Sequence, residues 1–239
     1  MPFTFSHPAA VIPLKALFKR LCLPALVFGS MAPDFEYFFR MKSRYSHSIG
    51  GLFFFDLPLA IMLLFLFFLI VREPLIINLP PPIRSRFVKM LNIEWLSYFK
   101  KEWFIICVSA LLGSATHILW DGFTHANGYF VENSAALTSL IAGSIPLYRL
   151  LQHFSTILGI AVIAVYIYKL PKSDIPPAER RRHVYWLLSG GLFILSFLFY
   201  KFFLWGALNS LWHIVIIALS SFFSAVTLSS LIFKFRKSF

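Results

Sequence analysis

The stretch LFFFDLPLAIMLLFLFFLIV, residues 52–71, is almost entirely apolar and contains one ionisable side chain, Asp56. It belongs to a candidate membrane span at 48–71, and a helix needs about 20 predominantly apolar residues to cross a bilayer. Four further stretches have the same character, and they lie at 103–120, 154–170, 184–204 and 211–233. The sequence therefore predicts an all-α, polytopic transmembrane helix bundle.

The composition favours the same class of protein. Hydrophobic residues make up 59% of the chain and charged residues 13%, against about 45–50% and about 25% in soluble domains. Cys22 and Cys107 are far apart in apolar segments, so we expect no disulfide framework. The sequence has no Rossmann or P-loop fingerprint and no Gly-x-Ser-x-Gly elbow, so ATP-driven chemistry and serine hydrolysis have no support.

The net charge of +12 is distributed unevenly. Basic residues concentrate in the loops 72–102 and 171–183 and in the tail 234–239, whereas 121–153 and 205–210 carry only Arg149. This asymmetry predicts that the basic loops are cytoplasmic. Basic residues in such loops contact anionic lipid headgroups. We therefore expect membrane lipid as a partner and no nucleic acid, and the oligomeric state stays open.

The predicted organisation is one integral membrane domain over residues 1–239. An N-terminal hairpin occupies 1–47, the transmembrane bundle 48–233, and a basic cytoplasmic tail 234–239. Residues 8–20 reach only about 20 Å as a helix, which is less than the bilayer core. We therefore expect a re-entrant or short helical hairpin enclosed by other helices. Two alternatives stay open: a span formed by the apolar segment after it, and a cleaved signal peptide.

The stretch HILWDGFTH, residues 117–125, spaces His117, Asp121 and His125 four residues apart, along one stripe of a helix. The predicted order of spans places them at the non-cytoplasmic face, together with His47, His153 and His213. Neutral imidazoles and carboxylates are ligands for a divalent metal, most suitably zinc, with manganese or iron as alternatives. A structural hydrogen bond between His117 and Asp121, or a helix that simply ends at Asp121, would explain the same pattern.

Five longer motifs carry a family resemblance: MPFTFSHPAAV, GSMAPDFEYF, SHSIGGLFFFDLPL, HILWDGFTHANG and LQHFSTILG. They resemble a bacterial family of multi-pass membrane proteins known as a domain of unknown function, over nearly the whole chain. More distantly, the order His, Pro-Asp, Ser/Thr-His-Ser, His-x-x-x-Asp is similar to inner-membrane metal-dependent hydrolases. That group is reminiscent of zinc-dependent phospholipase C in its ligand types. The resemblance implies five metal ligands: His7, Asp34, His47, His117 and Asp121.

The sequence also departs from the hydrolase pattern. That group usually reads Pro-Asp-x-Asp-His, whereas this chain has Pro33, Asp34, Phe35, Glu36 and Tyr37. The number of metal ions and the catalytic competence of the site therefore stay open. His125 adds a nitrogen where the group commonly has proline.

Two functions follow from this reading. The first is a membrane-embedded, metal-dependent hydrolase that acts on a phosphoester or lipid-linked substrate at the outer face. Glu36 would deprotonate water, His125 would be an extra ligand or general acid/base, and Arg44 and Arg149 would bind an anionic substrate. The second is a transporter or lipid-handling protein, in which the cluster is a proton relay or a structural metal site. Internal symmetry typical of transporters is not evident in the sequence.

Overall fold

The computed structural model describes residues 3–40, 45–141, 143–174, 182–203 and 211–236. These residues are almost entirely helical, apart from a small antiparallel pairing of β1 (Leu140–Ile141) with β2 (Ile145–Pro146). Five of the described helices are long and apolar enough to cross a membrane, and they are Ile49–Asn78, Trp95–Glu132, Leu147–Lys169, Arg182–Phe203 and His213–Phe235. The predicted all-α polytopic architecture is confirmed.

The first two of these helices extend beyond the predicted spans. The first is continuous to Asn78 and consists of α4 (Ile49–Gly51), η3 (Leu52–Asp56), α5 (Leu57–Leu66), η4 (Phe67–Val71) and α6 (Arg72–Asn78). Pro80 has an extended backbone and precedes α7 (Pro81–Phe87), because proline cannot continue a helix but starts one well. The second begins with α8 (Trp95–Thr124), which continues past Asp121. The alternative that the helix ends at Asp121 is therefore wrong.

The chain divides into two compact units. The first contains Met1–Phe35, Ser43–Leu64 and Phe99–Lys169, and the second contains Glu36–Lys42, Phe65–Tyr98 and Leu170–Phe239. The long helices from Ile49 and from Trp95 each contribute residues to both units.

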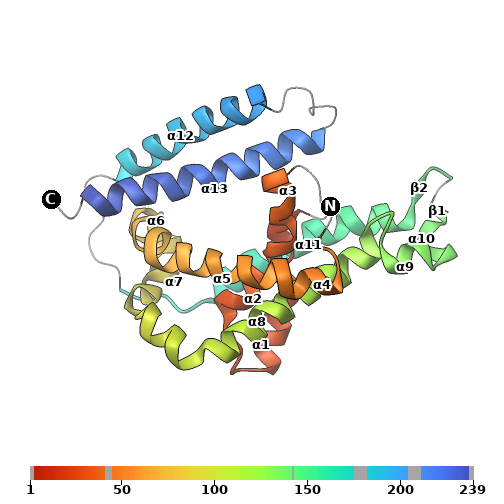
Figure 1. Cartoon of the computed structure of the whole chain (residues 1–239), viewed down its shortest axis with the longest axis horizontal. Helices are drawn as coiled ribbons and strands as arrows, with labels where there is room; N and C mark the ends of the chain where they lie inside the picture. Colours follow the sequence, from red (N-terminus) through yellow and green to blue (C-terminus); the bar gives the residue numbers. More distant parts are fainter. Residues whose placement is uncertain (1–2, 41–44, 142, 175–181, 204–210, 237–239) are drawn as a thin grey trace. The chain divides into compact units, whose positions relative to one another are not determined.

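The first unit begins with the predicted short helical hairpin. After the 3₁₀ turn η1 (Thr4–Ser6), α1 (Pro8–Leu17) packs against α2 (Leu23–Met31), both drawn in red in Figure 1. Each helix has proline at its start, where the missing N–H has no helical partner to lose. Val11, Leu21 and Leu26 form a buried apolar cluster against α8 side chains that include Ile105 and Leu112.

Two glycines allow α2 to cross α8 at backbone contact. A Cβ atom on Gly29 would overlap the carbonyl oxygen of Ala110, and a Cβ atom on Gly113 would overlap that of Leu26. Small residues at a helix crossing let membrane helices approach closely. The Ser114 hydroxyl strengthens this crossing because it donates a hydrogen bond to the Gly29 carbonyl at 2.9 Å. The crossing fixes the end of α2, and with it the 3₁₀ turn η2 (Ala32–Asp34), beside α8.

The rest of the first unit holds the N-terminal segment in place. After α8 come α9 (Tyr129–Glu132), α10 (Ala135–Thr138) and α11 (Leu147–Lys169). α11 contacts η1 and α1, and a Cβ atom on Gly159 would lie 2.9 Å from the Ser6 side chain. The Phe3 N–H also donates to the Thr156 hydroxyl at 3.3 Å.

The second unit contains the helix pair formed by α12 (Arg182–Phe203) and α13 (Leu211–Arg236), which lie along each other in Figure 1. The Tyr185 hydroxyl and the Ser230 hydroxyl are 3.0 Å apart in their buried interface. α6 packs against both helices and against η5 (Val88–Asn92), while α3 (Phe35–Arg40) joins this unit from Glu36 onward.

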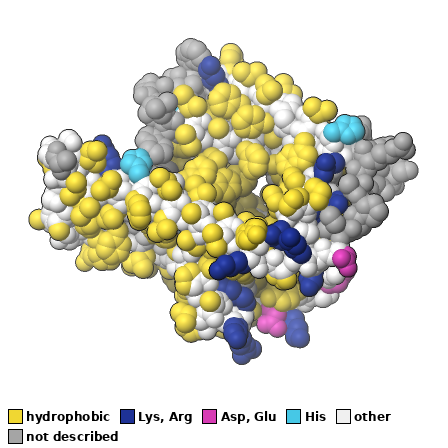
Figure 2. Space-filling view, turned by 180° about the vertical axis from the view of Figure 1, so that it is seen from behind, with side chains coloured by type: hydrophobic (Ala, Val, Ile, Leu, Met, Phe, Trp, Pro, Cys, Tyr) yellow, Lys and Arg dark blue, Asp and Glu magenta, His cyan; other side chains and the backbone are white. Residues whose placement is uncertain are grey.

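The described surface carries many large hydrophobic side chains, which is unusual for a protein in water. Figure 2 shows them spread over the visible face, with few acidic groups among them. Examples are Leu187 on α12, which is 72% exposed, and Ile157 on α11, which is 71% exposed. A lipid environment would cover such side chains, in agreement with the membrane-spanning helices.

Candidate metal centre

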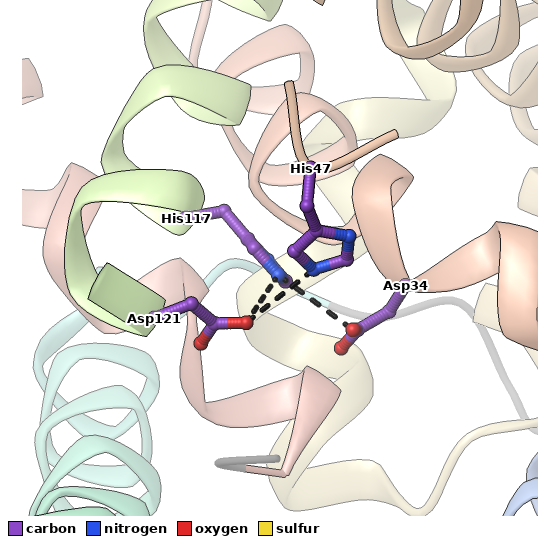
Figure 3. Close-up of side chains that lie close together, drawn as sticks. All are labelled: Asp34, His47, His117 and Asp121. Carbon is purple, nitrogen blue, oxygen red and sulfur yellow. Dashed lines mark ion pairs between the residues drawn. The ribbon is translucent and has the colours of Figure 1, made fainter. Parts of the chain in front are cut away.

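Four side chains from three distant segments meet inside the first unit (Figure 3). They are Asp34 at the end of η2, His47 just before α4, and His117 and Asp121 on α8. Each offers one ligand atom, and these atoms all lie within 4.8 Å of one another. A group of two imidazoles and two carboxylates at this separation could hold a metal ion.

The distances in the cluster are too long for good hydrogen bonds. The His117 Nε2 atom lies 3.3 Å from Asp121 Oδ2 and 3.6 Å from Asp34 Oδ1. The His47 Nε2 atom lies 3.4 Å from Asp121 Oδ2. Hydrogen bonds between nitrogen and oxygen are about 2.7–3.2 Å long. Two ligands bonded to one tetrahedral zinc ion at about 2.0 Å lie about 3.3 Å apart. The three nitrogen–oxygen pairs above are close to this separation, and all four ligand atoms lie within 4.8 Å of one another.

Two further histidines contact the same carboxylate. The His7 Nε2 atom lies 3.5 Å from Asp121 Oδ1, and the His7 ring stacks on the His117 ring with 3.7 Å between centroids. The His125 Nδ1 atom lies 3.4 Å from Asp121 Oδ1. The i, i+4, i+8 stripe on α8 therefore does point to one place, and Asp121 is the residue that all the histidines of the cluster share.

Hydrogen bonds from outside the cluster orient its members. The Nδ1 atom of His117 lies 2.7 Å from the Ser30 carbonyl oxygen, so Nδ1 carries the proton and Nε2 presents its lone pair to the carboxylates. The Thr4 hydroxyl donates to Asp34 Oδ2 at 2.6 Å, which leaves Oδ1 to face His117. Partners of this kind are typical of metal ligands, because they fix the tautomer and direction of each side chain.

The Ser-His-Ser motif has a local explanation. The Ser48 side chain caps α4 by accepting a hydrogen bond from the Gly51 N–H at 3.0 Å. The Ser46 hydroxyl lies 2.9 Å from His47 Nδ1. The first serine therefore orients the imidazole and the second starts the helix, so that His47 Nε2 faces Asp121.

The cluster is deeply buried on one side and open on the other. The side chains of Asp34 and His117 are 0% exposed, whereas those of His47 and His125 are 26% and 21% exposed. Burial, and then the neighbouring His117, hold the pKa of His7 well below its ordinary value, so this imidazole is neutral. Burial raises the pKa of Asp34, against the opposing effect of His117. A divalent cation would favour ionised carboxylates and neutral imidazoles here.

The other predicted site residues are not part of this cluster in the described structure. Arg149, at the start of α11, is exposed, and so is His153 one turn later. Glu36 is buried in the second unit. Arg44 lies outside the described residues. The roles assigned to Glu36, Arg44 and Arg149 stay predictions.

Sequence reasoning missed the residues that orient the ligands. Thr4 and Ser30 lie in the quoted MPFTFSHPAAV and GSMAPDFEYF motifs, but nothing in their spacing marks them as partners of Asp34 and His117. Gly29 and Gly113 were also missed. A glycine in each of two apolar helices is a signal for close packing, yet the sequence does not say which helices cross.

Comparison with known proteins adds a family but no activity. The sequence model of one family, described as a domain of unknown function (DUF4184), matches residues 1–232. No curated protein and no solved structure matches the chain. The similarity to inner-membrane metal-dependent hydrolases is therefore not supported by these comparisons.

Proposed function

Since the chain belongs to the family described as a domain of unknown function (DUF4184), we propose a function from the His/Asp cluster: a membrane-embedded, metal-dependent hydrolase. Its substrate is a phosphoester or another lipid-linked compound at the outer face of a bacterial inner membrane, with the basic loops in the cytoplasm. Zinc is the metal that we favour, and manganese or iron would fit the same donors.

The observation that carries the proposal is the spacing of Asp34, His47, His117 and Asp121. Their nearest nitrogen–oxygen distances are 3.3, 3.4 and 3.6 Å. The charges also balance, because two carboxylates and two neutral imidazoles cancel the charge of one divalent cation. A neutral assembly suits the buried side of the site, where Asp34 and His117 are 0% exposed, since an isolated buried charge is costly.

The residues of the chain have distinct tasks in this proposal. A bound divalent metal supplies Lewis acidity, which activates water near neutral pH and polarises a phosphoryl oxygen. Asp34 and Asp121 hold the negative charge that keeps the cation in place. The partly exposed rings of His47 and His125 lie on the side by which a substrate can enter. Arg149 is exposed at the start of α11, where its guanidinium would attract an anionic headgroup.

The proposal is tested by hydrolysis assays on the purified chain in lipid nanodiscs. Soluble phosphomonoesters, phosphodiesters and phospholipids are offered with and without zinc, and released product is measured. We expect zinc-dependent release that falls at least 100-fold in Asp121→Asn and is unchanged in His153→Ala, an exposed histidine on α11. Metal binding without hydrolysis of any substrate would overturn the proposed enzymatic activity and leave a structural metal site. Hydrolysis that survives Asp121→Asn would also overturn it.

A further inference from the structure

The two oxygens of the Asp121 carboxylate face different pairs of imidazoles. Oδ2 lies 3.3 Å from His117 Nε2 and 3.4 Å from His47 Nε2. Oδ1 lies 3.5 Å from His7 Nε2 and 3.4 Å from His125 Nδ1. The four-residue group described above uses only the Oδ2 side. The rings of His7 and His125, on the Oδ1 side, are not part of this group.

Of the two histidines beside Oδ1, His7 is the harder to explain by contacts within the protein alone. It is 1% exposed, and neither ring nitrogen has a hydrogen-bond partner among the described residues. Buried polar groups are nearly always hydrogen-bonded, so such an imidazole calls for a ligand. Its ring stacks on the His117 ring at an interplanar angle of 19°. His7 therefore lies beside the four-residue group, but its Nε2 atom faces Oδ1 and not Oδ2.

His125 follows directly after α8 and brings the second donor. Its Nδ1 atom lies 3.2 Å from the Asp121 backbone carbonyl oxygen, and its Nε2 atom is buried with no hydrogen-bond partner in the described part of the chain. When Nδ1 carries the proton, Nε2 has a free lone pair, as is common in histidines that bind metal. The unused donor of His125 is therefore Nε2, on the ring whose Nδ1 atom lies 3.4 Å from Asp121 Oδ1.

We propose that Asp121 bridges two metal ions. Asp34, His47, His117 and Asp121 Oδ2 bind the first, and His7, His125 and Asp121 Oδ1 bind the second. This rests on the metal site of the proposed function. Carboxylates of paired metal sites bridge ions about 3.5–4 Å apart. The Asp121 carboxylate suits such a bridge because each of its oxygens has its own pair of imidazoles nearby.

The two positions differ in the number of protein ligands, and this difference assigns their roles. Four protein ligands close the coordination of a tetrahedral ion, as in structural sites, whereas catalytic sites keep three and leave one position open. The first position has four and the second has three. The second position is therefore where solvent or substrate would bind. With neutral His7 and His125 and a shared carboxylate, the pair of ions carries excess positive charge, which favours an anionic group such as a phosphoester.

The inference is tested by the metal content of the full-length chain in detergent. After reconstitution with zinc and removal of the excess, we expect two equivalents per chain in wild type and in the control His153→Ala. We expect one equivalent in His7→Ala and one in His125→Ala. His125 is partly exposed, so its variant checks the result if the buried His7 variant fails to fold.

A second readout uses manganese in place of zinc. Two bridged manganese ions give an exchange-coupled electron paramagnetic resonance spectrum, whereas a single ion gives the six-line pattern of an isolated centre. We expect the coupled spectrum in wild type and the isolated pattern in His125→Ala. One equivalent in wild type, retained in both histidine variants, would overturn the bridged pair, and the hydrolysis assay described above then decides the proposed function on its own. No bound metal at all would overturn both.

Discussion

The Nδ1 atom of His117 on α8 lies 2.7 Å from the carbonyl oxygen of Ser30 on α2. This contact sets the tautomer of the imidazole and turns Nε2 toward Asp121 and Asp34. The positions of the nitrogen and oxygen atoms that could bind a metal therefore depend on where α2 crosses α8, and not only on which residues carry those atoms. Gly29 and Gly113 determine that crossing because any side chain there would meet the backbone of the other helix.

Replacing either glycine at the crossing by alanine is expected to damage both the fold and the site. Overpacking a tight contact costs about 1–3 kcal/mol, and here the obstacle is backbone, which cannot rotate away. Gly29→Ala and Gly113→Ala should lower the midpoint of thermal unfolding in detergent and weaken zinc binding together. The matched control is Gly190→Ala on α12, where an added Cβ meets nothing within 4 Å. It should be neutral or stabilising by about 1 kcal/mol. Equal behaviour of all three variants would contradict the close crossing.

Thr4→Val removes the hydroxyl that orients Asp34 and keeps the size of the side chain. The loss of such a partner typically weakens metal affinity about 10- to 100-fold. We expect an effect of this size in a competition titration with a zinc chelator. Thr116→Val is the control, because the Thr116 hydroxyl bonds only the Gly113 carbonyl of its own helix. A Thr4→Val protein with wild-type affinity would mean that Asp34 needs no orienting partner.

The sequence predicted the candidate ligands better than it predicted the residues that orient them. Helical spacing alone puts His117, Asp121 and His125 on one stripe, so these three could be predicted from the sequence. The family motifs added His7, Asp34 and His47. All six lie together in the structure. Thr4 and Ser30 were not predicted, because a threonine hydroxyl or a backbone carbonyl becomes a partner only once the helices are placed. His153 is exposed on α11, and its expected place at the non-cytoplasmic face stays a prediction.

Metal removal should lower the stability of the chain. A ligand that binds only the folded state stabilises it by about 2.7 kcal/mol when present at 100 times its Kd. We expect a strong chelator to lower the thermal unfolding midpoint of wild type, and added zinc to restore it. Asp121→Asn should not respond to either treatment. If wild type and Asp121→Asn respond alike, the metal binds somewhere other than the cluster.

We predict the orientation in the membrane from the basic loops, and labelling tests it. With Cys22 and Cys107 replaced by alanine, Lys172→Cys and Asn133→Cys each provide one exposed thiol. A membrane-impermeant maleimide added to intact cells should label Asn133→Cys and not Lys172→Cys. Both should react after the cells are lysed. The reverse pattern in intact cells would place the cluster on the cytoplasmic side.

The fold class was predictable because long apolar stretches have few alternatives to membrane-spanning helices. Boundaries were less predictable, since a helix does not end where its apolar stretch ends: α6 continues to Asn78. Within α8, Glu102 has a non-helical backbone (φ −117°, ψ 19°), so the helix is kinked directly before the predicted start of its span at residue 103. The crossing of α2 and α8 was not predictable at all. It depends on the fit of Gly29 against Ala110, which no single segment contains.

The most direct test of the metal centre is X-ray absorption at the zinc edge on the purified, reconstituted chain. We predict nitrogen and oxygen ligands at about 2.0 Å, outer-shell scattering from imidazole rings, and no sulfur ligand. In Asp121→Asn we predict that the bound zinc is lost. A wild-type chain that retains no zinc, or an Asp121→Asn spectrum identical to that of wild type, would contradict a metal centre built on Asp34, His47, His117 and Asp121.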